Sequence, residues 1–405
     1  MDNGLFQEVP GGVTAPKGFI AGGIYAGIRK VKKDLAIIVS QSPAVAAAVF
    51  TTNKTQAAPV IVDKEQLSKS SQMRAVVVNS GNANACTGEQ GMKDAWAMVD
   101  ATARALDIPR GEILVSSTGV IGQFMPIDKV LPGIAALAGA LTQDGSHDAA
   151  EAIMTTDTYA KEIAVRFSVG GVPVTIGAIA KGSGMIAPNM ATMLAFATTD
   201  AAIAPEALQH ALRAANRVSF NRITVDGDMS TNDMLAVLAN GTAGNSVITP
   251  GTPAFQTFQA ALEYILIRMA KLIARDGEGA TKLIEVHVTG AATEAEAEQA
   301  ARAVANSNLV KTAIHGADAN WGRIIAAVGY SGIDVVPERV AIGFNGLPVL
   351  RPNYEIVLDE AKAKTELEKE NISVNIDLHQ GTAEARFWTC DLTKDYIHIN
   401  ASYRS

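Results

Sequence analysis

One stretch of the chain has the layout of a self-cleaving nucleophile. Residues 181–194 read KGSGMIAPNMATML and place Thr192 directly after the small residue Ala191. A threonine hydroxyl in this setting can attack the preceding carbonyl, which turns the peptide into an ester, and water then releases a new N-terminal threonine. We therefore expect cleavage between Ala191 and Thr192 into two fragments, 1–191 and 192–405.

A freed N-terminal threonine carries its own base. Its α-amino group has an unperturbed pKa of about 7.7–8.0 and can take the hydroxyl proton near neutral pH, which an amide nitrogen cannot do. Cleavage also needs a tightly held turn, and Gly182, Gly184 and Pro188 are residue types that allow unusual backbone angles or fix a turn. On its own, a Gly-rich segment with an Ala-Thr pair is more often an ordinary loop.

The rest of the sequence makes the assignment specific. The 181–194 segment resembles the signature of the ornithine acetyltransferase (glutamate N-acetyltransferase) family, which reads K-G-x-G-M-I-x-P-N-M-A-T-M-L. Eight further blocks resemble the family in the same order, so the chain is identified as a member. They are NSGNANACTG (79–88), SSTGVIG (116–122), MTTDT (154–158), VDGDMSTND (225–233), ARDGEGATK (274–282), HGADANWGR (315–323), CDLTKDY (390–396) and NASYRS (400–405).

The resemblance implies a ping-pong acetyl transfer in arginine biosynthesis. N2-acetylornithine gives its acetyl group to Thr192 and leaves as ornithine; glutamate then takes the acetyl group and leaves as N-acetylglutamate. Some members also accept acetyl-CoA as a donor, and the motifs do not separate the two kinds. No Walker-type loop or Rossmann fingerprint is present, so we expect no nucleotide cofactor.

Acyl transfer needs donors aimed at the oxygen that becomes negative in the tetrahedral intermediate. Thr118 and Gly119 follow a strand-like run, where the glycine lets the backbone approach the acyl oxygen and the threonine hydroxyl can donate. The resemblance implies that this pair forms the oxyanion hole. A plain strand-ending turn is the alternative interpretation.

The resemblance also implies a set of substrate-binding residues. Lys181 would pair with the substrate α-carboxylate, and we expect Glu278 to meet an ammonium group. The alternatives are a solvated loop lysine at Lys181, a helix cap at Thr155, and an unstructured tail over 400–405. The complete set is Thr155, Lys181, Thr192, Glu278, Asn400 and Ser405. The last two imply that the carboxy-terminal tail folds back over the site.

Composition fits a compact enzyme with small-molecule substrates. The 405 residues are 48% hydrophobic with a formal net charge of −7, and the short basic cluster at 29–33 stands alone, which argues against nucleic-acid or acidic-membrane partners. The start of the chain lacks a basic and apolar signal, and no apolar run approaches about 18 residues, so we expect a cytoplasmic protein.

No pattern predicts a metal or a disulfide. Cys86 and Cys390 lie far apart, and we expect two reduced, packed thiols. The six histidines form no HxH or HExxH motif, and carboxylates such as Asp226 and Asp228 lack the spacing of a calcium loop. We expect no metal and no cofactor.

Alternating strand-like and helical segments must position these residues. Strand-like runs occur at 35–39, 74–78, 112–115 and 283–288, and apolar stripes at helical spacing run over 92–106 and 255–272. Thr293 and Glu296 make a capping box that begins a further helix. This α/β or α+β pattern has no linker, so we expect the cleavage point to lie inside one folded unit.

The resemblance implies layered sheets flanked by helices, formed jointly by both fragments. It also implies that the fragments stay associated in a heterotetramer of two α and two β chains. Three competing interpretations remain open. They are an N-terminal-Thr amidohydrolase or aminopeptidase, in which water takes the acyl group, a secondary-pathway acetyltransferase relative, and a non-catalytic binding protein.

Overall fold

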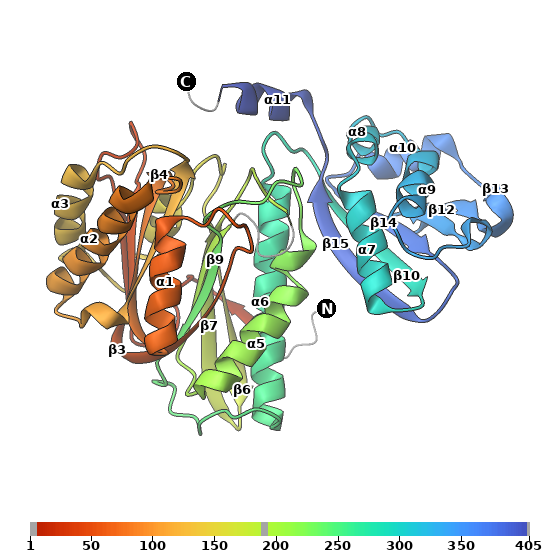
Figure 1. Ribbon diagram of the computed structural model, residues 1–405. Helices are drawn as coiled ribbons and strands as arrows, with labels where there is room; N and C mark the ends of the chain where they lie inside the picture. The colour runs from red at the N-terminus through yellow and green to blue at the C-terminus, as the bar shows by residue number, and fades with distance from the viewer. Residues whose placement is uncertain (1–5, 188–192, 403–405) are drawn as a thin grey trace. The chain divides into compact units, whose positions relative to one another are not determined.

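The computed structural model describes residues 6–187 and 193–402 (Figure 1), and the chain divides into two compact units. The first contains residues 6–185, 193–221 and 228–269, and the second contains 186–187, 222–227 and 270–402. The last boundary falls inside one continuous helix, α6 (Pro253–Arg275). No linker composition marks this division in the sequence, because a boundary inside a helix needs no linker.

In the described part of the first unit, nine strands form one mixed sheet. The strands are β1 (Gln7–Val9), β2 (Phe19–Ile24), β3 (Leu35–Phe50), β4 (Gln72–Asn82), β5 (Ile113–Val120), β6 (Lys161–Val169), β7 (Val172–Lys181), β8 (Leu194–Thr199) and β9 (Met234–Ala239). They follow the order β1-β6-β7-β8-β9-β3-β4-β5, with β2 also paired to β3. Strands from both sides of the 191–192 bond thus share the sheet, as expected.

The long strand β3 joins two halves of this sheet. One of its edges pairs with β4, whereas its other edge pairs first with β2 and then, over residues 45–50, with β9. The register with β4 shifts between Val39 and Ala44. An irregularity of this kind bends a strand and increases its twist, so the two halves need not lie in one plane.

Contacts between distant strands show that the sheet folds back on itself. Lys181 on β7 and Thr118 on β5 are joined by a hydrogen bond of 3.3 Å, although four strands lie between them in the sheet order. In a flat sheet, five steps of about 4.8 Å would separate these strands by about 24 Å. The ends of β5 and β7 therefore meet because the sheet curves at β3.

Helices cover the layers formed in this way (Figure 1). Alternate β3 residues, Leu35, Ile37 and Val39, share a core with α1 (Ala58–Lys69), α2 (Gly88–Leu106) and α3 (Ile127–Ala138). The intervening Ala36 and Ile38 share a second core with α4 (Ser146–Ala152) and with side chains of β7, β8 and β9. The start of α6 packs on β6 through Phe258 and Phe167, and α5 (Pro205–Arg217) bonds to β3 through Gln209. The layered α/β fold is confirmed.

The second unit has its own mixed sheet, which the described residues order as β13-β12-β11-β14-β10-β15. The strands are β10 (Leu283–Ala291), β11 (Ala341–Phe344), β12 (Leu347–Arg351), β13 (Glu355–Ile356), β14 (Asn371–Asp377) and β15 (Ala383–Cys390). Its helices are α7 (Glu294–Ala305), α8 (Asn308–His315), α9 (Trp321–Gly329), α10 (Glu360–Leu367) and α11 (Lys394–Ala401).

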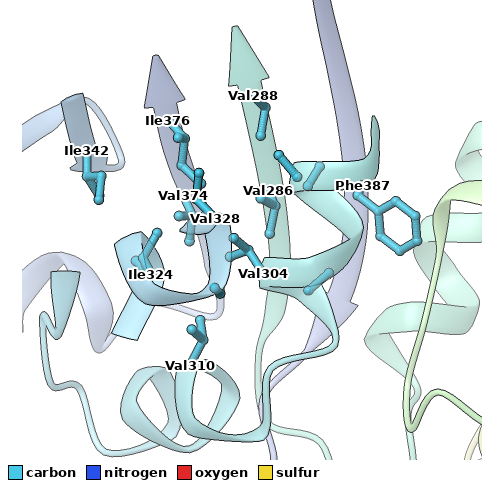
Figure 2. Packing of buried hydrophobic residues seen from close by; sticks show 14 of the residues in the cluster. Val286, Val288, Val304, Val310, Ile324, Val328, Ile342, Val374, Ile376 and Phe387 are labelled. Carbon is cyan, nitrogen blue, oxygen red and sulfur yellow. The ribbon is translucent and has the colours of Figure 1, made fainter. Parts of the chain in front are cut away.

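One face of this second sheet is apolar. Alternate residues of β10 and β14, such as Val286 and Val374, point toward Val304 of α7 and Val328 of α9 (Figure 2). Full burial of each such side chain adds about 1.5–3 kcal/mol to the free energy of unfolding. Because side chains alternate along each strand, the apolar ones gather on one face of the sheet, and the helices pack against that face.

Most element predictions are confirmed. The four strand-like runs fall in β3, β4, β5 and β10 to within one residue, and the two apolar stripes fall on α2 and α6. Thr293 caps α7 by accepting a hydrogen bond of 3.2 Å from the Glu296 N–H. The cysteine prediction needs one correction: Cys390 is buried, but Cys86 is exposed.

We predict that Gly119 tolerates no side chain. Its φ of +136° is left-handed, and a Cβ there would lie far inside contact distance of the Gly81 backbone on β4. Gly122 is the matched control, because its φ of +78° is also positive but a Cβ there would meet open space. We expect Gly122→Ala to cost about 1 kcal/mol and Gly119→Ala to lower the melting temperature much further. Equal melting temperatures would contradict the close approach.

Candidate active site

Thr118 and Gly119 lie at the carboxyl end of β5. β4 and β5 run in parallel, and Gly119 pairs with Gly81, so two glycines let the backbones approach closely. Thr118 is 8% exposed, and its hydroxyl oxygen accepts a hydrogen bond of 3.3 Å from Lys181 Nζ. The predicted pair thus lies at a constrained strand end and not in a free turn.

Lys181 is the last residue of β7, and its side chain points inward. The residue is only 4% exposed, so the alternative of a solvated loop lysine is wrong. Its contact with Thr118 brings together two predicted site residues that are 63 positions apart in the sequence. An ammonium group that donates to a threonine hydroxyl leaves the hydroxyl hydrogen available for another acceptor.

A buried carboxylate, Asp157, binds the backbone on either side of the region that contains Lys181. One of its oxygens accepts hydrogen bonds from the Gly182 N–H and from Lys161 Nζ, both at 2.7 Å, and the other accepts from the Thr155 N–H at 2.9 Å. Burial raises the pKa of this carboxyl, but the charges of Lys161 and Lys181 and the hydrogen bonds outweigh burial and lower the pKa from 3.8 to about 2. The group is therefore ionised at neutral pH.

Thr155 belongs to the same region. It is half-buried, and its carbonyl accepts a hydrogen bond of 3.1 Å from the Arg29 guanidinium, which also binds the Met154 carbonyl at 2.8 Å. Thr155 lies between α4 and β6, so it is not a helix cap. Asp157 and Arg29 together fix the backbone of Thr155 on both sides.

Buried asparagines fix the strand end that carries Thr118. Ser117 Oγ donates to Asn79 Oδ1 at 2.6 Å, and the Ser117 carbonyl accepts from Asn232 Nδ2 at 2.8 Å. These three residues are at most 7% exposed. Because a paired polar network inside a protein is costly to break, the peptide that leads into Thr118 has one orientation.

The predicted cleavage point lies in the connection between β7 and β8. Ala191 and Thr192 fall outside the described residues, whereas Leu194, at the start of β8, pairs with Lys181. Within the described part of this connection, Met185 has a φ of +56°, a conformation that costs a side-chain-bearing residue about 1 kcal/mol. The sequence analysis expected unusual backbone angles at Gly182 and Gly184, and not at Met185. The Ile186 N–H then donates to Asp226 Oδ1 at 2.9 Å.

Glu278 and Asn400 meet in the second unit. Asn400 Nδ2, on α11, donates to Glu278 Oε2 at 2.7 Å. Glu278 is only 7% exposed, whereas Asn400 is exposed. The tail residue is therefore helical and bonded, and not part of an unstructured tail, while Ser405 lies outside the described residues.

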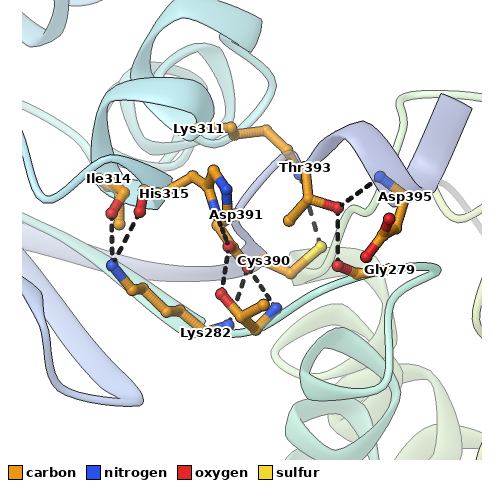
Figure 3. A network of polar contacts seen from close by, with 10 residues as sticks. Gly279, Lys282, Lys311, Ile314, His315, Cys390, Asp391, Thr393 and Asp395 are labelled. Atoms are coloured by element: carbon orange, nitrogen blue, oxygen red, sulfur yellow. Dashed lines mark hydrogen bonds and ion pairs between the residues drawn. The ribbon is translucent and has the colours of Figure 1, made fainter.

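A polar network anchors the Gly-rich turn that carries Glu278 (Figure 3). Thr393 caps α11 by accepting from the Asp395 N–H at 3.1 Å, and it donates to the Gly279 carbonyl at 2.8 Å. Asp391 accepts from Thr281 and from His315 Nδ1. Burial raises the pKa of Asp391, but its hydrogen bonds lower the pKa by more.

Several residues of this arrangement were missed from the sequence. His315 and Asp226 had no assigned role, and they now have one each, in bracing Asp391 and Ile186. Asp157 and Asn232 lie inside family-like blocks, which is the only signal that could have marked them. Their roles depend on contacts between distant segments, which spacing along the chain does not show.

The described residues contain neither a metal-binding cluster nor a membrane-spanning helix. Within 6–187 and 193–402, no three His, Cys, Asp or Glu side chains gather as a metal site requires. Over the same part of the chain, every helix is too short or too polar to cross a bilayer.

Comparison with known proteins places this chain in a family. The ArgJ family model matches residues 20–405. The arginine biosynthesis bifunctional protein ArgJ of Symbiobacterium thermophilum is 56% identical over 403 residues, with 98% of this chain and 100% of the relative covered, and that of Caldanaerobacter subterraneus is 51% identical with the same coverage. The crystal structure of ArgJ from Bacillus halodurans is 50% identical with a TM-score of 0.51, covering 52% of this chain and 100% of that chain. This chain belongs to the ArgJ family.

Proposed function

We propose that this enzyme transfers the acetyl group of N2-acetylornithine to glutamate through an acetyl ester of Thr192, as a step of arginine biosynthesis. The observation that carries the proposal is the buried contact between Lys181 and Thr118, since it joins a cation for the substrate carboxylate to a donor for the acyl oxygen. The name shared by the relatives supports the pathway.

The proposed first half-reaction makes one ester and breaks one amide. The Thr192 hydroxyl attacks the acetyl carbonyl while its own α-amino group takes the hydroxyl proton. The oxygen of the tetrahedral intermediate is stabilised by the Thr118 hydroxyl and the Gly119 N–H. Collapse transfers the proton to the departing nitrogen, and ornithine leaves. In the second half-reaction, the amine of glutamate attacks the ester and restores the Thr192 hydroxyl.

Lys181 has two proposed tasks in this scheme. Its ammonium binds the α-carboxylate that both amino acids share. It also donates to the Thr118 oxygen, which polarises the hydroxyl and makes its hydrogen a better donor to the intermediate. The Leu194 backbone, two residues after the nucleophile, pairs with Lys181, so the chain that carries Thr192 leaves the sheet beside this lysine.

The remaining parts of the proposal follow the family resemblance. Thr155, Glu278, Asn400 and Ser405 bind substrate, with Glu278 directed at an ammonium group. The bifunctional name of the relatives supports acetyl-CoA as a second donor, and the proposed chemistry needs no metal or cofactor. Cleavage at 191–192 is supported by the Bacillus halodurans crystal chain, which matches 52% of this chain over its whole length, the share of one fragment. We propose that the fragments stay associated as a cytoplasmic heterotetramer.

We predict cleavage and acetylation at Thr192, measured by intact mass. Wild type should give fragments 1–191 and 192–405, and N2-acetylornithine should add one acetyl group to the second fragment, which glutamate removes. Thr192→Ala should remain whole, whereas Thr192→Ser, which keeps a hydroxyl, should be cleaved. Removal of the adduct by water at the same rate without glutamate would indicate an amidohydrolase. A whole, active wild-type chain would contradict the proposal.

A second prediction concerns the oxyanion donor. Thr118→Val keeps the shape of the side chain but removes the hydroxyl, so kcat should fall by about 10²–10³ while KM changes little. Thr118→Ser keeps the donor and should retain most of the activity. Rates are divided by the cleaved fraction, so that an effect on maturation is not counted as an effect on transfer. Equal rates for the two variants would remove the hydroxyl from the mechanism.

A third prediction concerns the buried charge of Glu278. Glu278→Gln keeps the size of the side chain and the contact with Asn400 but removes the negative charge. The KM for N2-acetylornithine should rise about tenfold, the equivalent of about 1.4 kcal/mol, with a smaller change for glutamate. Glu384→Gln, an exposed site in the same unit, serves as the control. An unchanged KM for both substrates would show that the charge has no such role.

A further inference from the structure

The strand that carries Thr118 and Gly119 lies at one end of the first sheet. Within the described residues, β5 pairs with β4 alone, so its other edge has no neighbouring strand. This part of the strand is nevertheless buried: Ile113 and Val115 are 0% exposed and Ser117 is 1% exposed. Backbone N–H and C=O groups on a buried edge need other hydrogen-bond partners.

Helix α1 supplies two of these partners. Gln66 Nε2 donates to the Ile113 carbonyl at 2.7 Å. Asp63 Oδ1 accepts from the Val115 N–H at 2.8 Å. The two side chains are three positions apart on α1, so they lie on the same face of the helix. One face of α1 thus bonds to the backbone of β5 where a further strand would otherwise pair.

A third side chain continues this row of bonds. Asn232 Nδ2 donates to the Ser117 carbonyl at 2.8 Å. Ile113, Val115 and Ser117 are two positions apart, as expected for backbone groups that face one edge of a strand. The next residue in this series is Gly119, whose N–H is a proposed oxyanion donor. The row therefore holds the strand that leads into the proposed oxyanion hole.

Asp63 has an unusual setting for a carboxyl group. The residue is 0% exposed, and among the described residues its second carboxyl oxygen, Oδ2, has no hydrogen-bond partner. One N–H donor does not offset the cost of burying an ionised carboxylate, whereas a neutral carboxylic acid needs no counter-ion. Burial raises the pKa of Asp63 well above its ordinary value of 3.8, and the hydrogen bond from Val115 lowers the pKa by less.

The charged groups on the elements around Asp63 have other partners or lie at the surface. Strands β3 and β5 contain no charged residue. The groups with other partners are Asp94 with Gln90, Asp100 with Arg110, Glu112 with Gln72, Lys69 with Glu65, and Lys64 with the Phe50 ring. Those at the surface of α2 are Glu89, Lys93 and Arg104. Burial and the Val115 N–H therefore decide the state of Asp63.

We propose that Asp63 is a positioning residue that works as a neutral carboxylic acid: one oxygen accepts the Val115 N–H, the other carries the proton, and β5 is thereby held in place for Thr118 and Gly119. Asp63 touches no reacting atom, and its effect on acetyl transfer passes through β5. The positioning role rests on the proposed function, which takes Thr118 and Gly119 as oxyanion donors. The neutral state of Asp63 does not depend on that function.

Two variants separate the hydrogen bond from the charge. Asp63→Asn keeps an acceptor for the Val115 N–H and is neutral at every pH. Asp63→Leu has a similar size but no acceptor, so the buried Val115 N–H loses its partner. Asp144→Asn, at an exposed aspartate of the same unit, is the matched control for the loss of one negative charge.

The neutral state is measured by infrared spectroscopy at neutral pH and by melting temperature from about pH 5 to pH 8. The spectrum of wild type minus that of Asp63→Asn should show the C=O band of a protonated carboxyl group. The unfolded chain releases the Asp63 proton above its ordinary pKa while the folded protein keeps it, so wild type loses stability relative to Asp63→Asn as the pH rises toward the folded pKa. The melting temperature of Asp63→Asn minus that of wild type should therefore increase by about 3 °C or more over this range, unlike that of Asp144→Asn. A spectrum without the band, or a difference that stays flat, overturns the inference.

The rate of acetyl transfer from acetylornithine to glutamate tests the positioning role. Asp63→Leu should lower kcat about tenfold with little change in KM, because the oxyanion donors shift, whereas Asp63→Asn should stay within about twofold of wild type. Rates are divided by the cleaved fraction. If Asp63→Leu does not fold, Gln66→Met removes the donor to the Ile113 carbonyl and should lower kcat in the same way. An unchanged kcat overturns the positioning role. Wild type that shows the infrared band but transfers no acetyl group contradicts the proposed function and not the neutral state of Asp63.

Discussion

The hydrogen bond between Lys181 and Thr118 sets the main constraint on the first unit. It joins the ends of β7 and β5, which have four strands between them in the sheet. Only a sheet that folds back on itself brings these ends together, and the bend is made at β3, where the register shifts. The layered arrangement and the proposed site therefore have one cause.

Many buried polar groups lie at the site, because they hold the two strand ends that meet there. Asn79, Ser117 and Asn232 hold the end of β5, and Asp157 holds the end of β7, each through several hydrogen bonds. Each strand end thus has hydrogen bonds of its own that hold it in place. Groups that are already oriented need no rearrangement when charge develops, which is the main contribution that a protein makes to acyl transfer.

In the second unit, the predicted site residues Glu278 and Asn400 are held in place in a different way. The turn that carries Glu278 and the helix that carries Asn400 are tied to each other by Thr393, and Asp391 ties the same turn to His315 (Figure 3). Helix α11 is short and has no buried side chain. Hydrogen bonds therefore hold α11 in place, whereas packing against the sheet holds α7.

The sequence by itself determined the family, the elements and the identity of the candidate groups. Period-two and helical patterns located β3, β4, β5, β10, α2 and α6, because burial of one face follows directly from side-chain spacing. The blocks around Thr118, Lys181 and Glu278 could be recognised because their residue types are unusual together. Only the tertiary structure decided that Lys181 contacts Thr118, that Asp157 binds both Lys161 and the Gly182 N–H, and that the chain divides inside α6. Such contacts join residues far apart in sequence, and they depend on how a sheet bends, which no local pattern encodes.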